Sequence, residues 1–197
     1  MSKKTKPKTK TEVHEYQAEM QKLLEILVHS LYTEREIFVR ELVSNASDAL
    51  SKVQLTTLTE EKVLDKDEEL QIKITFDENK LKLEIEDSGC GMTKEELVSN
   101  LGTIANSGTL KFLQQAQSEN KSAENLIGQF GVGFYSVFMV AERVELTTRS
   151  WELNSQAWEW SSSGGGQYEI TPAEYDQRGT RVTIFLKEDA KEFCSKW

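Results

Sequence analysis

The sequence is poor in cysteine and proline, with two of each in 197 residues. Cys90 and Cys194 are far apart, so they offer neither a disulfide framework nor the ligand spacing of a zinc site. We therefore expect reduced thiols in a reducing compartment, the cytoplasm. The two histidines, His14 and His29, are predicted to lie in helical positions. Neither has a second metal ligand nearby, so we expect structural roles for both.

Long apolar runs and an excess of positive charge are also absent. No stretch approaches the roughly 20 apolar residues that span a bilayer, and the basic N-terminus is not followed by the apolar core of a signal peptide. The formal net charge is -9, which disfavours attraction to phosphate backbones. We expect neither a membrane nor a nucleic acid as a partner.

The apolar content of 38% is that of an ordinary globular protein. Residues 1–11 consist almost wholly of Lys, Thr and Pro, which cannot bury enough apolar surface to offset the entropy of ordering. We predict a flexible basic arm over 1–11 and one folded domain over 12–197.

Helical spacing of apolar residues predicts a first helix from Glu15 to Leu31 and a second from Thr33 to about Val53. Thr33 and Glu36 match a capping box at the start of the second helix. Alternating apolar and polar residues then predict an antiparallel hairpin, with strands at 70–76 and 81–85 joined by the polar turn 77–80.

The hairpin leads into a glycine-containing loop, Asp87 to Met92, after which Thr93 and Glu96 signal another helix. The segment 102–128 is polar with glycine near both ends, which is typical of a movable lid. Further elements are predicted as an apolar helix at 135–140 and strands at 143–149, 156–160, 167–171 and 179–186, broken by Gly164–Gly166 and Pro172.

Three polar residues share one side of the second predicted helix. Glu41, Asn45 and Asp48 stand at i, i+4 and i+7, which at about 100° per residue confines them to a stripe roughly 60° wide. The apolar arc with Phe38 and Leu42 borders this stripe, so the three groups could edge a buried cleft. A solvated helix border has the same spacing.

Two glycine clusters could serve a ligand. Asp87 ends an apolar strand and enters a loop with two glycines, which places a carboxylate where backbone can approach a ligand, although ordinary turns use the same residues. Gly128, Gly131 and Gly133 precede a predicted helix start, where free N–H groups and the helix dipole favour phosphate. No Gly-Lys-Ser/Thr follows, so this is not a Walker A loop.

Four segments occur in an order that resembles the heat-shock protein 90 family. They are Glu41-Leu-Val-Ser-Asn45-Ala-Ser-Asp48-Ala-Leu, Asp87-Ser-Gly-Cys-Gly91-Met92, Leu101-Gly-Thr-Ile-Ala105 and Gly128-Gln-Phe-Gly-Val-Gly-Phe134. The wider superfamily with gyrase, sensor histidine kinases and mismatch-repair ATPases shares only a looser pattern. The resemblance implies an α+β two-layer sandwich, in which helices on one face of a mixed, mostly antiparallel sheet enclose the nucleotide.

The resemblance also implies ATP or ADP with Mg²⁺ as ligands. Asp87 would bind the adenine amine, with Gly91 and Thr180 joining through water, and Asn45 would hold Mg²⁺ through its amide oxygen. Glu41 would be catalytic, activating or orienting the water that attacks the γ-phosphate. The implied nucleotide-binding residues are Asn45, Asp48, Asp87, Gly91, Met92, Asn100, Asn106, Gly131, Gly133, Phe134 and Thr180.

The sequence departs from the family at Asn106, where members usually carry Lys or Arg. A contact of this residue with the terminal phosphate would therefore lack the positive charge of the usual side chain. The implied function is that of the nucleotide-binding domain of an ATP-dependent molecular chaperone. Such a protein hydrolyses ATP as a full-length homodimer and couples lid closure to the folding of unfolded or partly folded client proteins. The family's middle and C-terminal domains are not part of this chain.

Two other functions stay open at this point. A histidine-kinase-type ATP domain would transfer phosphate to a partner histidine, although its members lack the long match from Glu41 to Asp48. A nucleotide-regulated interaction module would bind ATP without meaningful catalysis.

Overall fold

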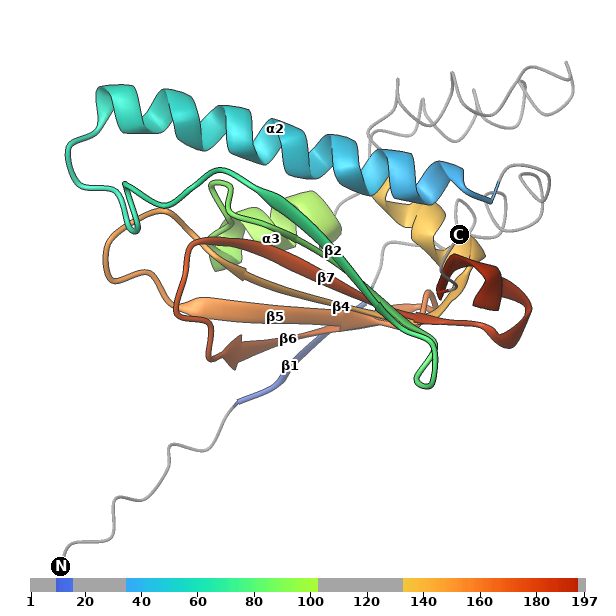
Figure 1. The fold of residues 1–197 in the computed structure, drawn as a ribbon. Coiled ribbons are helices and arrows are strands. Elements are labelled where there is room, and N and C mark those ends of the chain that lie inside the picture. Colours follow the sequence, from blue (N-terminus) through green and yellow to red (C-terminus); the bar gives the residue numbers. More distant parts are fainter. Residues whose placement is uncertain (1–9, 16–34, 103–132, 195–197) are drawn as a thin grey trace, which may run out of the picture.

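The computed structural model describes residues 10–15, 35–102 and 133–194, and these form two layers. One layer is a seven-stranded sheet, and helices cover one of its faces (Figure 1). The helical segments are α2 (Ile37–Thr59), α3 (Lys94–Gly102) and the 3₁₀ segments η1 (Gly133–Met139) and η2 (Glu188–Cys194). This is the predicted two-layer α+β sandwich.

The strands are β1 (Glu12–Glu15), β2 (Ile72–Asp77), β3 (Lys82–Asp87), β4 (Ala141–Arg149), β5 (Ala157–Ser162), β6 (Gln167–Ala173) and β7 (Gly179–Leu186). Their order across the sheet is β1-β6-β5-β4-β7-β3-β2. Every pairing among the described strands is antiparallel, in agreement with the expected mostly antiparallel sheet. The predicted hairpin is confirmed as β2 and β3, and its turn is held by Asp77 Oδ1, which accepts the N–H groups of Asn79 and Lys80.

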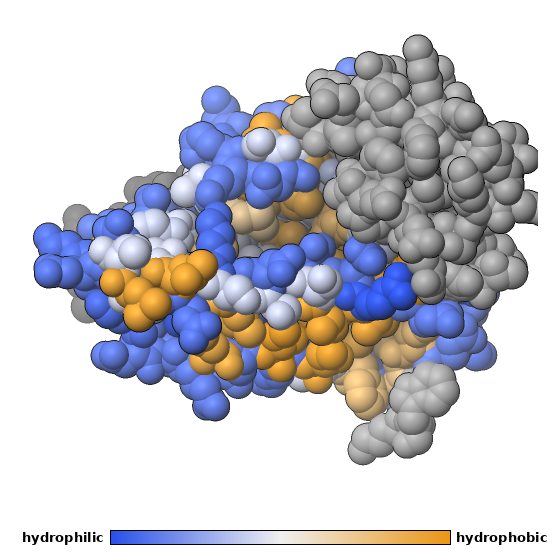
Figure 2. Space-filling model, turned by 90° about the horizontal axis from the view of Figure 1, so that it is seen from above, coloured by the Kyte–Doolittle hydropathy of each residue, from blue (hydrophilic) through white to orange (hydrophobic). Residues whose placement is uncertain are grey.

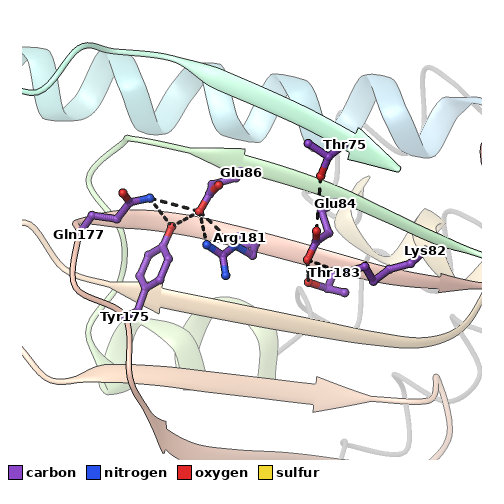
Figure 3. A network of polar contacts seen from close by, with 8 residues as sticks. All are labelled: Thr75, Lys82, Glu84, Glu86, Tyr175, Gln177, Arg181 and Thr183. Atoms are coloured by element: carbon purple, nitrogen blue, oxygen red, sulfur yellow. Dashed lines mark hydrogen bonds and ion pairs between the residues drawn. The ribbon is translucent and has the colours of Figure 1, made fainter. Parts of the chain in front are cut away.

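Alternation along the strands sorts side chains between the two faces. The helix-covered face carries the core, with Trp160, Ile170 and Ile184 completely buried. The opposite face is polar. There Glu86 Oε1 accepts hydrogen bonds from Tyr175, Gln177 and Arg181 (Figure 3). Because Glu86 and Asp87 are neighbours on one strand, this network requires Asp87 to face the helices.

Helix α2 differs from its prediction at both ends. It begins at Ile37, and Glu36 precedes it without a side-chain cap, so the predicted start at Thr33 is wrong; Thr33 itself lies outside the described residues. Burial of Ile37 and Phe38 against the core defines this end instead of a capping box. The helix also continues beyond Val53 to Thr59, and threonine hydroxyls in its last turns donate back to helix carbonyls.

Three further predictions need correction. His14 lies in strand β1 and stacks on Tyr168, with ring centroids 5.1 Å apart, so the helical position expected for it is wrong. Pro172 does not break a strand, because it lies in β6 past the end of the β1 pairing, where no partner needs its N–H. The apolar helix predicted at 135–140 is present as a 3₁₀ segment, but it runs from Gly133 to Met139, so its bounds are corrected.

Several predictions fall outside the described residues. These are most of the arm at 1–11 and of the first helix, the lid at 102–128 beyond Gly102, His29, Asn106, Gly128 and Gly131.

Candidate functional site

A cavity of about 640 Å³ opens between α2, α3 and the sheet, a volume within the usual range for small-molecule sites. Figure 2 shows the molecule from above, rotated by 90° from the view of Figure 1. This side of the molecule is hollowed, with apolar residues inside the hollow. The predicted site residues that line the cavity are Glu41, Asn45, Asp48, Asp87, Gly91, Met92, Asn100, Gly133, Phe134 and Thr180. Every predicted site residue within the described ranges is therefore at one place.

The polar stripe of α2 forms one wall of the cavity. Leu42 and Ala46 are buried against the core, and this orients Glu41, Asn45 and Asp48 into the cavity. The three residues therefore edge a cleft, as the first interpretation expects, and Asn45 and Asp48 are at the same time exposed to solvent. Within the described chain the Asn45 amide has no hydrogen-bond partner, which leaves its oxygen available to a ligand.

The loop after β3 forms the opposite end of the cavity, and its backbone is tied to three other elements. Cys90 N–H donates to Ala49 O at 3.1 Å and Cys90 O accepts from Trp151 N–H at 2.8 Å. Gly91 has φ of +58°, and a Cβ there would overlap the carbonyl of Arg149, so only glycine fits. Cys90 is buried and free, as predicted, and packs with Val53. The loop is therefore rigid before any ligand binds.

Asp87 is the buried carboxylate of this end, with 6% of its surface exposed. Burial raises its pKa to about 6, although hydrogen bonds from the backbone N–H groups of Gly89 and Thr180 and the charge of Arg178 oppose that rise. The Gly89 N–H lies 2.8 Å from Oδ1. At neutral pH the group is therefore a buried, ionised acceptor, ready to receive a hydrogen bond from a ligand.

This pKa predicts a pH-dependent affinity for adenine-bearing ligands. If the ionised carboxylate is the acceptor, affinity should be constant above about pH 7 and fall by up to about tenfold per pH unit below the pKa of about 6. Adenosine is the ligand to titrate, because nucleotide phosphates themselves titrate near pH 6. Calorimetry from about pH 8 to about pH 5 measures the profile, and an unchanged affinity across it contradicts the role of Asp87.

Gly133 brings the start of η1 against Glu41 of α2. A Cβ at residue 133 would overlap Glu41 Oε2 and lie 2.9 Å from its Cδ. The Glu41 side chain is only 16% exposed, so Gly133 and the core beneath define where the carboxylate can lie. This close approach joins the glycine cluster to the α2 stripe.

We therefore expect Gly133→Ala to displace the Glu41 carboxylate without unfolding the protein, because the obstructed atom is the end of a flexible side chain. A displacement near 1 Å should lower ATP turnover by roughly 10- to 100-fold. Gly165→Ala is the matched control, since its Cβ would meet only Ser163 Oγ at 3.8 Å. Equal turnover in the two variants shows that the position of Glu41 does not depend on Gly133.

The described wall of the cavity is rich in negative charge. Glu41, Asp48, Asp87 and Glu96 contribute carboxylates, whereas Lys52 is the one cation among the described lining residues. Lys52 Nζ lies 3.7 Å from Glu96 Oε1, an ion pair between α2 and α3. A phosphorylated ligand would therefore meet repulsion here unless it brings positive charge with it.

Two site residues escaped the sequence analysis. Arg178, 1% exposed, donates to Gly89 O at 3.2 Å and Asp65 O at 3.3 Å, so it joins the Asp87 loop to the segment before β2. No local sequence pattern identifies Arg178.

Thr148 is 0% exposed and accepts the N–H of Met92 at 3.0 Å. The only sequence signal for Thr148 was its inward position in a predicted strand. A buried hydroxyl there needs hydrogen-bond partners.

Comparison with known sequences agrees with this site. Residues 32–188 match the family described as Histidine kinase-, DNA gyrase B-, and HSP90-like ATPase. This match covers more than half of the chain. The two-layer α+β domain with its cavity is therefore an ATPase domain, and the chain belongs to this family of ATPases.

Individual relatives are bacterial proteins named Chaperone protein HtpG. The chain is 53% identical to that of Chlorobium chlorochromatii, over 93% of this chain and 29% of the relative. It is 54% identical to that of Chlorobium phaeobacteroides and 52% identical to that of Desulfitobacterium hafniense, each over 93% of this chain and 30% of the relative. The resemblance to the heat-shock protein 90 family is confirmed. The chain spans less than a third of the length of these relatives.

The relatives' names favour the chaperone ATPase over the histidine-kinase alternative. Among the described helices, none is both long and apolar enough to cross a membrane.

Proposed function

We propose that the chain binds ATP and ADP in this cavity, with the adenine at Asp87 and the phosphates between Asn45 and Gly133. We further propose that it hydrolyses ATP to ADP and phosphate within the full-length dimer, and only weakly as an isolated domain. The observation that carries the proposal is the convergence of the predicted residues on one cavity, although they come from α2, the loop after β3, α3, η1 and β7. Unrelated polar residues would not gather in this way.

The two ends of the cavity suit the two ends of a nucleotide. At one end Asp87 is buried and Met92 lines the cavity, which suits a flat base with an amine donor. The other end combines Asn45 with the start of η1, whose backbone N–H groups would meet phosphate oxygens. Asn100 of α3 lines the cavity beside Met92 and would face the ribose, and Phe134 lines the cavity beside Gly133.

Glu41 is the proposed catalytic residue. Its carboxylate lies one helical turn from Asn45 and is constrained by Gly133. From there it can orient a water molecule toward the γ-phosphate and accept its proton as the bond to phosphorus forms.

Mg²⁺ fits the donor set of this wall. Mg²⁺ prefers hard oxygen ligands and is commonly held by one or two protein groups together with substrate phosphates. The unpartnered Asn45 amide oxygen would be such a group, and the bound cation would neutralise phosphate charge beside the acidic wall. Among the described residues no cluster of three acidic, histidine or cysteine side chains could hold a metal alone, which suits joint binding with the nucleotide.

The cellular role belongs to the same proposal. Because relatives about three times longer are named chaperones, we infer that the domain works within a cytoplasmic, homodimeric chaperone acting on unfolded or partly folded clients. Binding of ATP would close the segment 102–128 over the cavity as a lid. We also propose that residues 1–11 form a flexible arm and residues 12–197 the ATP-binding domain.

Calorimetric titration of the purified chain with ADP and with a non-hydrolysable ATP analogue tests the proposal. We expect one saturable site for each ligand, and Mg²⁺ should strengthen binding of the analogue because it offsets the acidic wall. Absence of binding in the presence of Mg²⁺ would overturn the assignment. Radiolabelled ATP should release free phosphate and leave the protein unlabelled, whereas labelled protein would indicate the histidine-kinase alternative.

A further inference from the structure

Three polar side chains form one row across the sheet at the base-binding end of the cavity. Asp87 of β3 is the register partner of Thr180 of β7, and Thr180 is the partner of Thr148 of β4. All three face the helices. Asp87 and Thr180 line the cavity, whereas Thr148 is fully buried one strand further away.

The hydrogen bonds of Thr148 have only one consistent arrangement. Its Oγ1 lies 3.0 Å from Met92 N, 3.1 Å from Gly179 O and 3.0 Å from Thr180 Oγ1. A hydroxyl has one proton and two lone pairs. The Met92 N–H can only donate and the Gly179 carbonyl can only accept, so the Thr148 proton goes to Gly179. Thr180 must then donate its own proton to the remaining lone pair of Thr148.

This direction determines what Thr180 can offer a ligand. Its single proton is held by Thr148, so only lone pairs remain for the cavity. The ionised carboxylate of Asp87 is also an acceptor. Side chains at this end therefore accept hydrogen bonds and do not donate them, which suits the 6-amino group of adenine and opposes a 6-oxo group.

We propose that Thr148 is a specificity-determining positioning residue: by accepting the Thr180 proton it keeps the base-binding end free of hydroxyl donors, and so selects 6-amino purine nucleotides over 6-oxo ones. The proposal rests on the proposed function, because it requires the base to bind at Asp87. Thr148 acts through Thr180 and need not touch the ligand itself.

Titration with ADP and with inosine diphosphate, which carries a 6-oxo group in place of the amine, tests this role. Wild type should prefer ADP. In Thr148→Val the hydroxyl of Thr180 loses its acceptor and can turn its proton to the cavity, so the ratio of ADP to inosine diphosphate affinity should fall by about 3- to 10-fold, the range for one hydrogen bond. Asp87 maintains the remaining preference.

Two further variants separate selectivity from packing. Thr148→Ser retains the hydroxyl and should retain the wild-type ratio. Thr147→Val changes the neighbouring residue of β4, which faces the other side of the sheet, and should leave the ratio unchanged. If Thr148→Val does not fold, Thr148→Cys replaces it as the test. A thiol is a weaker acceptor than a hydroxyl, so the ratio of ADP to inosine diphosphate affinity should fall by less than expected for Thr148→Val.

Equal weakening of both ligands by Thr148→Val, or equal affinity of wild type for both, overturns the proposal and leaves Thr148 a structural residue. Wild type that binds neither ligand instead contradicts the proposed function.

Discussion

Replacing Glu41 with alanine is expected to lower ATP turnover by roughly 10²–10⁴-fold, the range for a positioned general base, with ADP affinity largely retained. The carboxylate lies in the cavity beside Asn45 and against Gly133, where a water near the γ-phosphate would be within its reach. Adenine binding depends on other residues, so binding and catalysis should separate. Single-turnover assays with protein in excess of radiolabelled ATP detect hydrolysis even when it is slow.

Glu41→Gln tests whether basicity is the lost property, because it keeps the shape and removes the proton acceptor. Glu95→Ala on α3 is the control, since Glu95 is exposed and lies outside the cavity lining. Hydrolysis at the wild-type rate in Glu41→Ala would falsify the catalytic role and make Glu41 only a wall of the cavity.

Asp87→Asn is expected to weaken ADP binding by about 100-fold or more. Loss of one charge-assisted hydrogen bond in a buried site costs about 1.5–3 kcal/mol, and an amide group also turns donor hydrogens toward the adenine amine. Calorimetric titration with ADP measures the loss.

Glu86→Gln is the matched control for Asp87→Asn. Glu86 is the preceding residue, but its carboxylate accepts from Arg181 and Tyr175 on the other face of the sheet (Figure 3). Its loss removes a neighbouring negative charge without a change in the cavity wall. Retention of wild-type affinity in Asp87→Asn, or an equal loss in Glu86→Gln, rules out Asp87 as the adenine acceptor.

The helix and strand assignments show where prediction from sequence succeeds. The β2–β3 hairpin and the inward stripe on α2 were predicted correctly, because periods of 2 and 3.6 residues follow from local geometry. Ends of elements were predicted less well. Helix α2 begins at Ile37 because its first turn packs on the core, and β6 passes through Pro172 because its neighbour β1 ends earlier; both depend on residues distant in sequence.

The sequence by itself determined which residue types stand at which spacing, and with them the family, the carboxylate proposed to bind the base and the acidic and amide groups of α2. The tertiary structure alone decided how these groups act. Burial of Asp87 raises its pKa, Gly133 lies close to Glu41 across two elements, and three strands in register bring the hydroxyls of Thr180 and Thr148 within hydrogen-bond distance. Desolvation and hydrogen-bond direction depend on neighbours brought together by folding, and no local pattern contains them.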